Sequence, residues 1–440
     1  MSKPVSPFII VAYGLPALAL SLPLIPGQVL VPAFYAANTA VTISTVGLVL
    51  FLSRCLDVLG DPFIGWLADR AMSAGRGFRR LVVFGAVLSG LSLYMLFVPA
   101  ENAGGLWLFG WSALLFTGWS AVQIPYTVAS ARISARRTDR LRLNGSRELV
   151  GLLGLVGAAL FIGLWPTETE ADQLLGLVVM TLFSGAFGLV IYCLCVPVPQ
   201  AGHSPAQGYS PLRVFRWFVR LWHDAPVRAL VGAWLLNGMS NALAAFCFPL
   251  YVLLVLESSL QDRGLLLLVY FLCGIAFIPL WVRLAGKWEK HRVWCWAMLL
   301  ACGAFLYVPL LSGGDFHAFL LICVITGAAL GADLVLPPAL QADVSDHDRL
   351  SVGQDRSGFL FSVWSMATKL SYGLAAGLGA LLLSFADISE NAASISDNGK
   401  ILLSLIYAFV PVVLKIWSAS IMWRFNLTKE EMKRIQQALS

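Results

Sequence analysis

Residues 174–197 read LLGLVVMTLFSGAFGLVIYCLCVP, an apolar stretch without a single charged side chain. A helix needs about 20 such residues to cross the hydrocarbon core of a bilayer. The stretch is typical of the chain, because 58% of its 440 residues are apolar and only 12% are charged, whereas soluble domains carry about a quarter charged residues. The composition therefore predicts a membrane protein and argues against a secreted, disulfide-stapled domain.

Apolar runs of spanning length recur along the chain, separated mostly by short polar connections. They do not alternate polar and apolar residues, which excludes a strand-type barrel. We predict an all-α membrane protein with twelve transmembrane helices and both termini in the cytoplasm. The predicted spans are residues 8–32, 41–68, 80–99, 106–131, 148–165, 174–197, 229–256, 264–285, 293–312, 317–341, 358–385 and 401–423.

The distribution of charge supports this topology. Most of the 30 Lys and Arg residues fall in the connections that it places in the cytoplasm, as the positive-inside rule requires. The net charge of +6 is therefore an orientation signal, and we expect no nucleic-acid partner. The first apolar run is too long for a signal peptide and lacks a cleavage site. The eight cysteines lie within or at the ends of spans, without the spacing of a metal site or disulfide.

The longest polar interruption, residues 197–226, divides the predicted spans into six and six. Residues 213–222 alternate aromatic and basic side chains, so this segment either lies on the inner leaflet as an amphipathic helix or merely joins the halves. We predict an N-terminal half at 1–198, a cytoplasmic linker at 199–227, a C-terminal half at 228–424 and a cytoplasmic helix at 425–440.

The C-terminal helix is predicted from its own residues. Thr428 and Glu431 form a capping box, and Met432, Ile435 and Leu439 share one apolar face. We expect this helix to pack beneath the bundle.

A short internal echo indicates duplication. Residues 65–70 read GWLADR and residues 281–287 read WVRLAGK, each followed by further basic residues. Parallel six-span halves are typical of transporters. The first element resembles the inner-loop motif of the major facilitator superfamily. The resemblance implies the major facilitator fold, in which Gly65, Asp69 and Arg70 act as a cytoplasmic latch.

Ionisable side chains at bilayer depth are costly and indicate function. Residues 54–62 read RCLDVLGDP, which places Arg54, Asp57 and Asp61 on one helical face. Two neighbouring carboxylates either share a proton or bind a cation between them. The alternative is a static ion-pair network that joins helices.

Counting 1.5 Å per residue from the span ends places Asp57 roughly 18 Å and Lys369 roughly 20 Å from the inner surface. Lys369 is therefore expected to approach Asp57 from the eleventh span. Asp333 lies at a similar level in the tenth span. It either pairs with Lys369 or contacts the substrate.

The second-span pattern Arg54-x-x-Asp57-x-x-x-Asp61-Pro62 resembles the signature of the glycoside–pentoside–hexuronide:cation symporters, the melibiose-permease branch of the superfamily. Further elements that fit are Tyr13-Gly14, Ile124-Pro125-Tyr126, Asp343-Val344-x-Asp346, Arg356-x-Gly358 and Lys369. The resemblance implies that Asp57 and Asp61 bind the coupling Na⁺ or proton, with Lys369 nearby. It also implies that Arg147 lies near the sugar site.

Two positions depart from the melibiose-type pattern. Ser21 and Gln123 stand where those members carry acids that bind sugar hydroxyls, which argues against galactoside transport. The missing acid in the fourth span also favours a proton over Na⁺, although Gln123 still offers a carbonyl oxygen.

Prolines interrupt the first, fourth, seventh and tenth predicted spans, which line the central cavity in this fold. The residues there are mainly aromatic and amidic, which suits a neutral or amphipathic organic solute, although each also suits packing. We predict coupling roles for Arg54, Asp57, Asp61, Gln123 and Lys369. We predict substrate contacts by Tyr13, Ser21, Gln123, Tyr126, Arg147, Asn237, Asn241, Asp333, Trp364 and Tyr372.

The predicted function is cation-coupled symport, with H⁺ or Na⁺, of a small organic solute, sugar-like or otherwise neutral or amphipathic, by alternating access. One alternative is a lysolipid-like substrate. Another, from a different class, is a non-transporting membrane sensor or assembly factor. We expect no enzyme activity, no catalytic residue, no metal other than a possible Na⁺ at Asp57 and Asp61, and no cofactor beyond the coupling ion. The expected partners are a small-molecule substrate and membrane lipid, with the chain a monomer in the plasma (inner) membrane.

Overall fold

The structure is a computed structural model. It describes residues 5–39, 41–73, 77–100, 102–133, 137–165, 169–197, 224–352, 357–385 and 395–439. These residues fold mainly into α-helices, which confirms the all-α prediction. The chain forms two compact units, Met1–Gly208 with Glu390–Ala392 and Tyr209–Ser389 with Ala393–Ser440.

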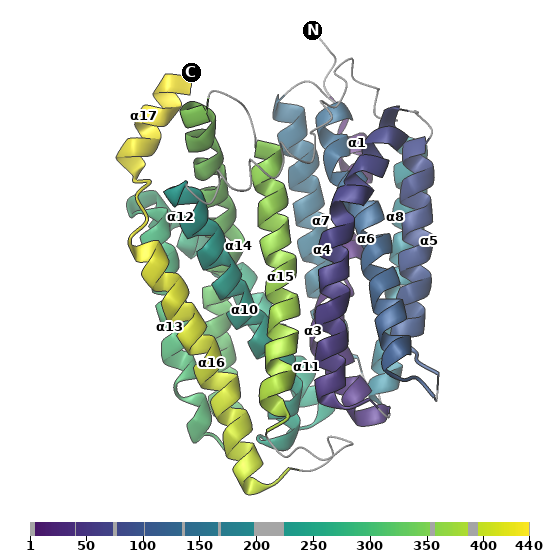
Figure 1. Ribbon diagram of the computed structural model, residues 1–440, viewed down its shortest axis with the longest axis vertical. Helices are drawn as coiled ribbons and strands as arrows, with labels where there is room; N and C mark the ends of the chain where they lie inside the picture. Colours follow the sequence, from purple (N-terminus) through teal and green to yellow (C-terminus); the bar gives the residue numbers. More distant parts are fainter. Residues whose placement is uncertain are drawn as a thin grey trace. The chain divides into compact units, whose positions relative to one another are not determined.

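Long helices stand side by side within each unit (Figure 1). The first unit contains α1 (Pro7–Gly14), α2 (Pro16–Ser21), α3 (Leu24–Asn38), α4 (Ile43–Ser73), α5 (Gly77–Phe97), α6 (Gly105–Ile133), α7 (Arg137–Leu164) and α8 (Glu170–Cys195). The second contains α10 (Ala225–Leu254), α11 (Leu260–Ala276), α12 (Ile278–Lys287), α13 (Lys290–Phe305), the 3₁₀-helix η1 (Val308–Leu310), α14 (Phe316–Val352), α15 (Ser357–Leu383), α16 (Asp397–Trp423) and α17 (Lys429–Leu439).

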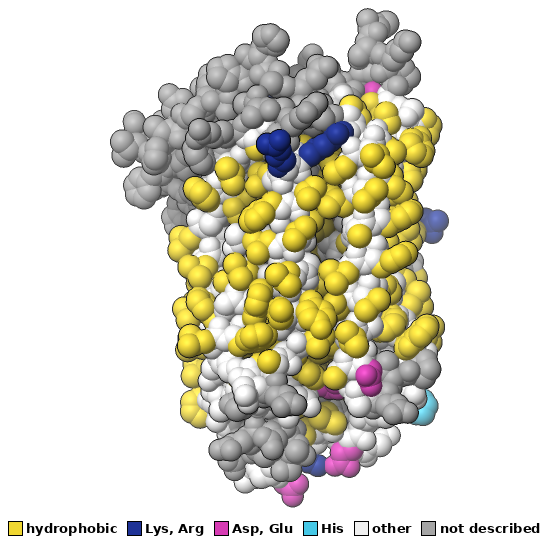
Figure 2. Space-filling model, turned by 90° about the vertical axis from the view of Figure 1, so that its right-hand side faces the viewer, with side chains coloured by type: hydrophobic (Ala, Val, Ile, Leu, Met, Phe, Trp, Pro, Cys, Tyr) yellow, Lys and Arg dark blue, Asp and Glu magenta, His cyan; other side chains and the backbone are white. Residues whose placement is uncertain are grey.

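Eleven helices of the described residues are long and apolar enough to cross a membrane. They correspond to the second through twelfth predicted spans, so the count of twelve is not confirmed. The first predicted span, residues 8–32, is broken into α1, α2 and α3. Hydrophobic side chains dominate the face drawn in Figure 2, and few charged side chains interrupt them.

Prolines explain where spans break. Pro16 and Pro23 cannot donate to the carbonyl groups one turn earlier, and α1 ends at Gly14 and α2 at Ser21. Pro279 has the same effect in the eighth span, where α11 ends before Phe277 and α12 begins at Ile278. By contrast, the prolines of the fourth, seventh and tenth spans lie inside continuous helices.

A tyrosine pair joins the first broken span to α6 in the core of the first unit. The Tyr13 hydroxyl donates to the Tyr126 carbonyl at 2.6 Å, and the Tyr126 hydroxyl donates to the Tyr13 carbonyl at 2.5 Å. Both rings are buried and lie near Tyr192 of α8. Each bond thus provides a hydrogen-bond donor for a backbone carbonyl group, which lipid cannot do.

The C-terminal helix α17 begins as the sequence predicted. The Glu431 backbone N–H donates to the Thr428 hydroxyl at 3.3 Å. Met432 and Ile435 are buried in the apolar core of the second unit, and Lys429 donates to the Gly286 carbonyl in the last turn of α12 at 2.9 Å. The predicted amphipathic segment at 213–222 lies outside the described residues.

Small residues allow helices to approach closely. On α6, a Cβ added at Gly118 would lie 2.7 Å from the Ser89 nitrogen of α5. In the second unit, a Cβ added at Gly331 of α14 would lie 2.5 Å from the Gly274 carbonyl oxygen of α11. Such close contacts take the place of a hydrophobic driving force between helices in lipid.

We expect Gly118→Ala to lower stability by about 1–3 kcal/mol, because the new methyl group meets rigid backbone. Gly110→Ala, also on α6, is the matched control, since a Cβ there has no neighbour within 4 Å. It should be neutral or stabilising by up to about 1 kcal/mol. Melting temperatures of the purified proteins in detergent test both expectations, and equal melting temperatures would contradict the packing argument.

Candidate functional site

The first candidate site lies around Asp57, where α4 packs against α6. Asp57 is only 5% exposed. Its Oδ1 accepts a hydrogen bond from the Ser120 hydroxyl of α6 at 3.0 Å, and its Oδ2 lies 3.5 Å from Nη1 of Arg54. The carboxylate is thus held from two helices, by one charged and one neutral donor.

Arg54 is positioned by an aromatic ring as well as by Asp57. Its guanidinium carbon lies 3.7 Å from the centre of the Phe116 ring. A cation over an aromatic face is attracted by the ring quadrupole, more strongly where water is excluded. Phe116 and Ser120 are four residues apart, so one face of α6 holds both members of the pair.

Asp61 and Gln123 lie one turn beyond these contacts. Asp61 is half-buried on α4, four residues after Asp57. Gln123 is three residues after Ser120 on α6, and its Oε1 accepts a bond from the Trp119 indole at 2.9 Å. The sequence prediction missed Ser120. Its only signal was the three-residue spacing to Gln123, which places both on one side of the helix.

Oxygen ligands are the chemistry that this site offers. Within the described residues, no group of three or more His, Cys, Asp or Glu side chains forms a metal site. The oxygens that the described structure brings together here are those of the Asp57 carboxylate and the Ser120 hydroxyl. Na⁺ is a hard cation and is suited to such a set, and a proton needs only the carboxylate.

Most of the other predicted substrate residues of the first unit lie outside α4 and α6, on α1, α2 and α7, whereas Tyr126 lies on α6. Ser21 ends α2 and faces α7, where a Cβ added at Gly151 would lie 3.0 Å from its hydroxyl. Arg147 of α7 contacts the exposed Glu148 carboxylate at 2.5 Å. Tyr13 and Tyr126 are buried, and both hydroxyls are engaged with backbone carbonyls. Their predicted substrate roles stay predictions.

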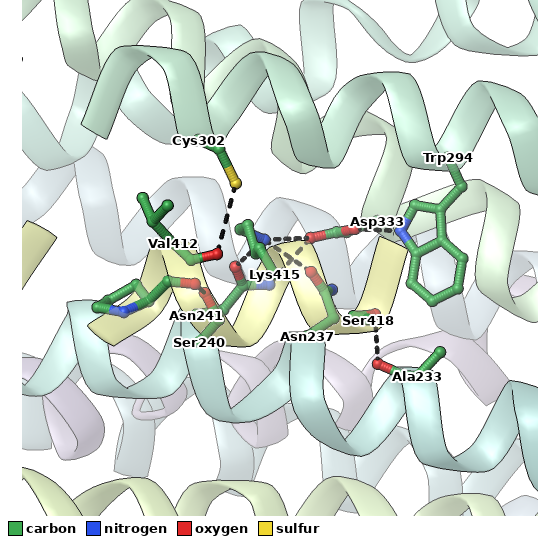
Figure 3. A network of polar contacts seen from close by, with 11 residues as sticks. Ala233, Asn237, Ser240, Asn241, Trp294, Cys302, Asp333, Val412, Lys415 and Ser418 are labelled. Carbon is green, nitrogen blue, oxygen red and sulfur yellow. Dashed lines mark hydrogen bonds and ion pairs between the residues drawn. The ribbon is translucent and has the colours of Figure 1, made fainter. Parts of the chain in front are cut away.

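The second unit brings three predicted residues together around a lysine. Lys415 of α16 donates to the Asn237 and Asn241 side-chain oxygens of α10, each at 2.7 Å. Its Nζ lies 3.8 Å from Oδ2 of Asp333 on α14. Asp333 accepts bonds from Asn241 at 2.9 Å and from the Trp294 indole at 2.6 Å (Figure 3).

This arrangement gives Asp333 a lysine partner that the sequence did not predict, and the two predicted roles of Asp333, pairing with Lys369 or contact with the substrate, stay predictions. Asp333 lies beside Lys415, because α16 packs against both α10 and α13 and carries the lysine between them. The sequence predicted no role for Lys415. A lysine eight residues before the end of a spanning helix, about 12 Å deep, was the available signal, since charges at such depth need partners.

A tryptophan pair adjoins the lysine cluster. Trp364 of α15 stacks on Trp234 of α10, with ring centres 4.4 Å apart and planes 16° apart. The Trp234 indole donates to the Thr368 hydroxyl at 2.7 Å, and its ring lies 6.4 Å from that of Trp294. The predicted substrate residues Asn237, Asn241, Asp333 and Trp364 therefore share one region of the second unit.

The remaining predicted residues are placed as follows. Lys369 and Tyr372 are half-buried on α15. The predicted approach of Lys369 to Asp57 involves both units and stays a prediction. Gly65 lies on α4, whereas the side chains of its predicted latch partners, Asp69 and Arg70, lie outside the described part of the chain.

An ion pair follows the second copy of the repeated element, residues 281–287. Lys290, which begins α13 just after the repeated element, contacts both carboxylate oxygens of Asp343 at 2.9 and 2.7 Å. Asp343 belongs to the acidic element near the end of α14. The pair therefore joins the ends of two helices of one unit.

Comparison with known proteins identifies relatives along nearly the whole chain. The family model described as MFS/sugar transport protein matches residues 12–429. The sphingosine-1-phosphate transporter MFSD2B of Xenopus tropicalis is 24% identical, covering 89% of this chain and 82% of that protein. The glucuronide carrier protein homolog of Escherichia coli K12 is 22% identical, covering 97% and 94%.

Two further similarities bear on function and fold. The human sodium-dependent lysophosphatidylcholine symporter 1 is 21% identical, covering 90% of this chain and 78% of that protein. A crystal structure of a point mutant of the nucleoside transporter NupG superposes with a TM-score of 0.67 at 13% identity, covering 94% and 99%. These matches confirm the predicted family resemblance and the major facilitator fold.

We expect Ser120→Ala to lower stability by about 1–3 kcal/mol, because a buried carboxylate oxygen loses its hydrogen bond. Ser92→Ala is the matched control: among the described residues, this buried serine bonds only to the Leu88 carbonyl of its own helix, so the loss should stay below about 1 kcal/mol. Detergent-solubilised melting curves of both variants provide the measurement. An equal loss in both would mean that Ser120 does not support Asp57.

Proposed function

The chain belongs to the MFS/sugar transport protein family, and from this premise we propose that it is a cation-coupled symporter of a small organic solute in the cytoplasmic membrane. The family and the apolar helices make it a multi-pass membrane transporter. Coupling to H⁺ or Na⁺ is supported by one observation above all. Asp57, inside a helix of spanning length, is almost fully buried and bonded to both a cation and a hydroxyl.

The coupling mechanism follows from charge. A bound proton or Na⁺ neutralises Asp57 and weakens its attraction to Arg54, which lies 3.5 Å away. Arg54 retains the Phe116 ring as a partner, so it can leave the carboxylate without being stranded in an apolar environment. The cation thereby weakens an ion pair within α4 and removes the charge from the carboxylate that accepts the bond from Ser120 of α6. In an alternating-access cycle, such a change makes solute binding depend on the cation.

The relatives support cation coupling and an organic solute. One relative is named as sodium-dependent and another as a glycoside/cation symporter. The aromatic and amide side chains around Trp234 and Asn241 suit a solute with both a polar and an apolar part. We propose that the chain acts as a monomer, with lipid as its only other partner.

Asp57→Asn should abolish gradient-driven solute uptake, because an amide neither takes up a proton nor carries the charge that attracts Na⁺. Uptake into proteoliposomes, driven in turn by a pH gradient and by a Na⁺ gradient, tests this and identifies the ion. Asp172→Asn is the control, since this exposed acid lies in the first turn of α8. Undiminished accumulation by a correctly folded Asp57→Asn protein would overturn the coupling role.

A lysolipid-like amphipath is a second candidate for the solute. It is favoured by Ser21 and Gln123, since sugar-binding acids are missing there, and by two relatives named for lysolipid-type substrates. If it is correct, lysophosphatidylcholine should inhibit uptake or binding of a labelled amphipath, whereas free sugars at millimolar concentration should not. Competition by sugars alone would favour the sugar-like solute instead.

A further inference from the structure

The ion pair between Lys415 and Asp333 is loose. The lysine nitrogen lies 3.8 Å from the carboxylate oxygen, which is beyond hydrogen-bond length. Its two short bonds, both 2.7 Å, go instead to the neutral amide oxygens of Asn237 and Asn241. Figure 3 shows the ammonium group between these amides and the carboxylate.

Asp333 does not depend on the lysine for its hydrogen bonds. One carboxylate oxygen accepts from the Trp294 indole at 2.6 Å and the other from the Asn241 amide at 2.9 Å. Both of these donors are neutral. The carboxylate can therefore keep its bonded position while Lys415 engages a second anion.

The cluster has more hydrogen-bond donors than acceptors. An ammonium group has three N–H bonds, and the described contacts of Lys415 use two of them for hydrogen bonds. Asn237 is 0% exposed, and its Nδ2 has no hydrogen-bond partner among the described residues. A buried donor without a partner is costly. What the cluster lacks is therefore an acceptor oxygen.

Joining helices does not by itself require these charges. One turn to either side, α10 and α16 are already joined by neutral bonds, from Ser240 to the Pro411 carbonyl at 2.9 Å and from Ser418 to the Ala233 carbonyl at 2.8 Å (Figure 3). A charged pair in the middle of the contact between α10 and α16 adds a desolvation cost that hydroxyl bonds avoid. This contrast favours a role in binding.

The partly exposed side of the cluster is aromatic. Trp234, Asn237 and Asn241 follow each other at three- and four-residue spacing on one face of α10. Asn241, Trp234 and its stacking partner Trp364 are half-buried, unlike Asn237. A solute approaching from that side would place an apolar or ring part against tryptophan and a polar head toward the lysine.

We propose that Lys415, with Asn237 and Asn241, binds an anionic oxygen group of the solute, a carboxylate or a phosphate, while Trp234 and Trp364 contact its apolar or ring part. The inference rests on the proposed transport of an organic solute and narrows it to an organic anion. Binding replaces the long attraction between Lys415 and Asp333 by a direct, charge-assisted hydrogen bond. It also gives the Asn237 amide an acceptor.

The test uses the full chain in lipid nanodiscs and three soluble probes. Phenyl β-D-glucuronide and phenyl β-D-glucoside differ only in a carboxylate replacing a hydroxymethyl group, and phenyl phosphate presents the other anion. Thermal shift against probe concentration gives the affinities. We expect at least one anionic probe to bind about tenfold or more tightly than the glucoside. The anionic probe that binds more tightly shows whether the site prefers a carboxylate or a phosphate group.

The variants separate binding from folding. Asp333→Asn keeps the lysine and removes the competing carboxylate, so anion affinity should be unchanged or higher. Asp333→Asn combined with Lys415→Met removes both charges, so no buried charge is left without an opposite charge. Compared with the Asp333→Asn variant, the double variant should prefer the anionic probe over the glucoside about tenfold less or weaker still. Lys400→Met is a control on the same helix, since Lys400 bonds to the exposed Glu257 at 2.7 Å and lowers the pKa of that carboxyl.

Three outcomes would overturn the proposal: equal affinity of the wild-type chain for anionic and neutral probes, binding of no anionic probe up to about 10 mM, or an anion preference that survives loss of Lys415. The assay compares anionic with neutral probes at one fixed pH and Na⁺ concentration, so an effect of the cation on overall affinity cancels in the anion preference. Asp57→Asn should abolish accumulation yet keep the anion preference, so the anion site and the proposed cation coupling can fail separately.

Discussion

A charge at the depth of the lipid core must find its partners within the protein, because neither lipid nor water solvates it there. This constraint organises the polar interior of both units. Asp57 is held by Arg54 and Ser120, and Lys415 by two asparagines and a carboxylate. Around each cluster, apolar side chains pack the helices together, and the charged groups find their partners on the helix faces that this packing brings into contact.

The two clusters satisfy this constraint differently. In the first unit the ion pair lies within one helix, and α6 contributes a ring and a hydroxyl. Neutralising the carboxylate therefore changes the contact between two helices. In the second unit neutral amides and an indole carry most of the bonds, and the opposite charges stand apart. That arrangement tolerates an added anion, whereas the first is suited to an added cation.

Much of the architecture could be predicted from hydrophobic runs and local spacing. The second through twelfth spans, the amphipathic C-terminal helix and the shared face of Arg54, Asp57 and Asp61 depend on composition and on residues a few positions apart. The break at Pro279 could have been predicted by the same rule as Pro16. The position of Lys415 beside Asp333 could not be predicted, because counting along a helix gives depth and leaves its rotation about its own axis unknown.

The sequence by itself determined that this chain is a helical membrane protein and a family member with acids at bilayer depth. Hydropathy and i, i+4 spacing are local properties that do not depend on how helices pack. Only the tertiary structure decided the partners of those charges. Ser120 lies 63 residues from Asp57, and the ligands of Lys415 are drawn from α10 and α14. Such contacts depend on which helix faces meet, and that is set by the packing of every neighbouring side chain at once.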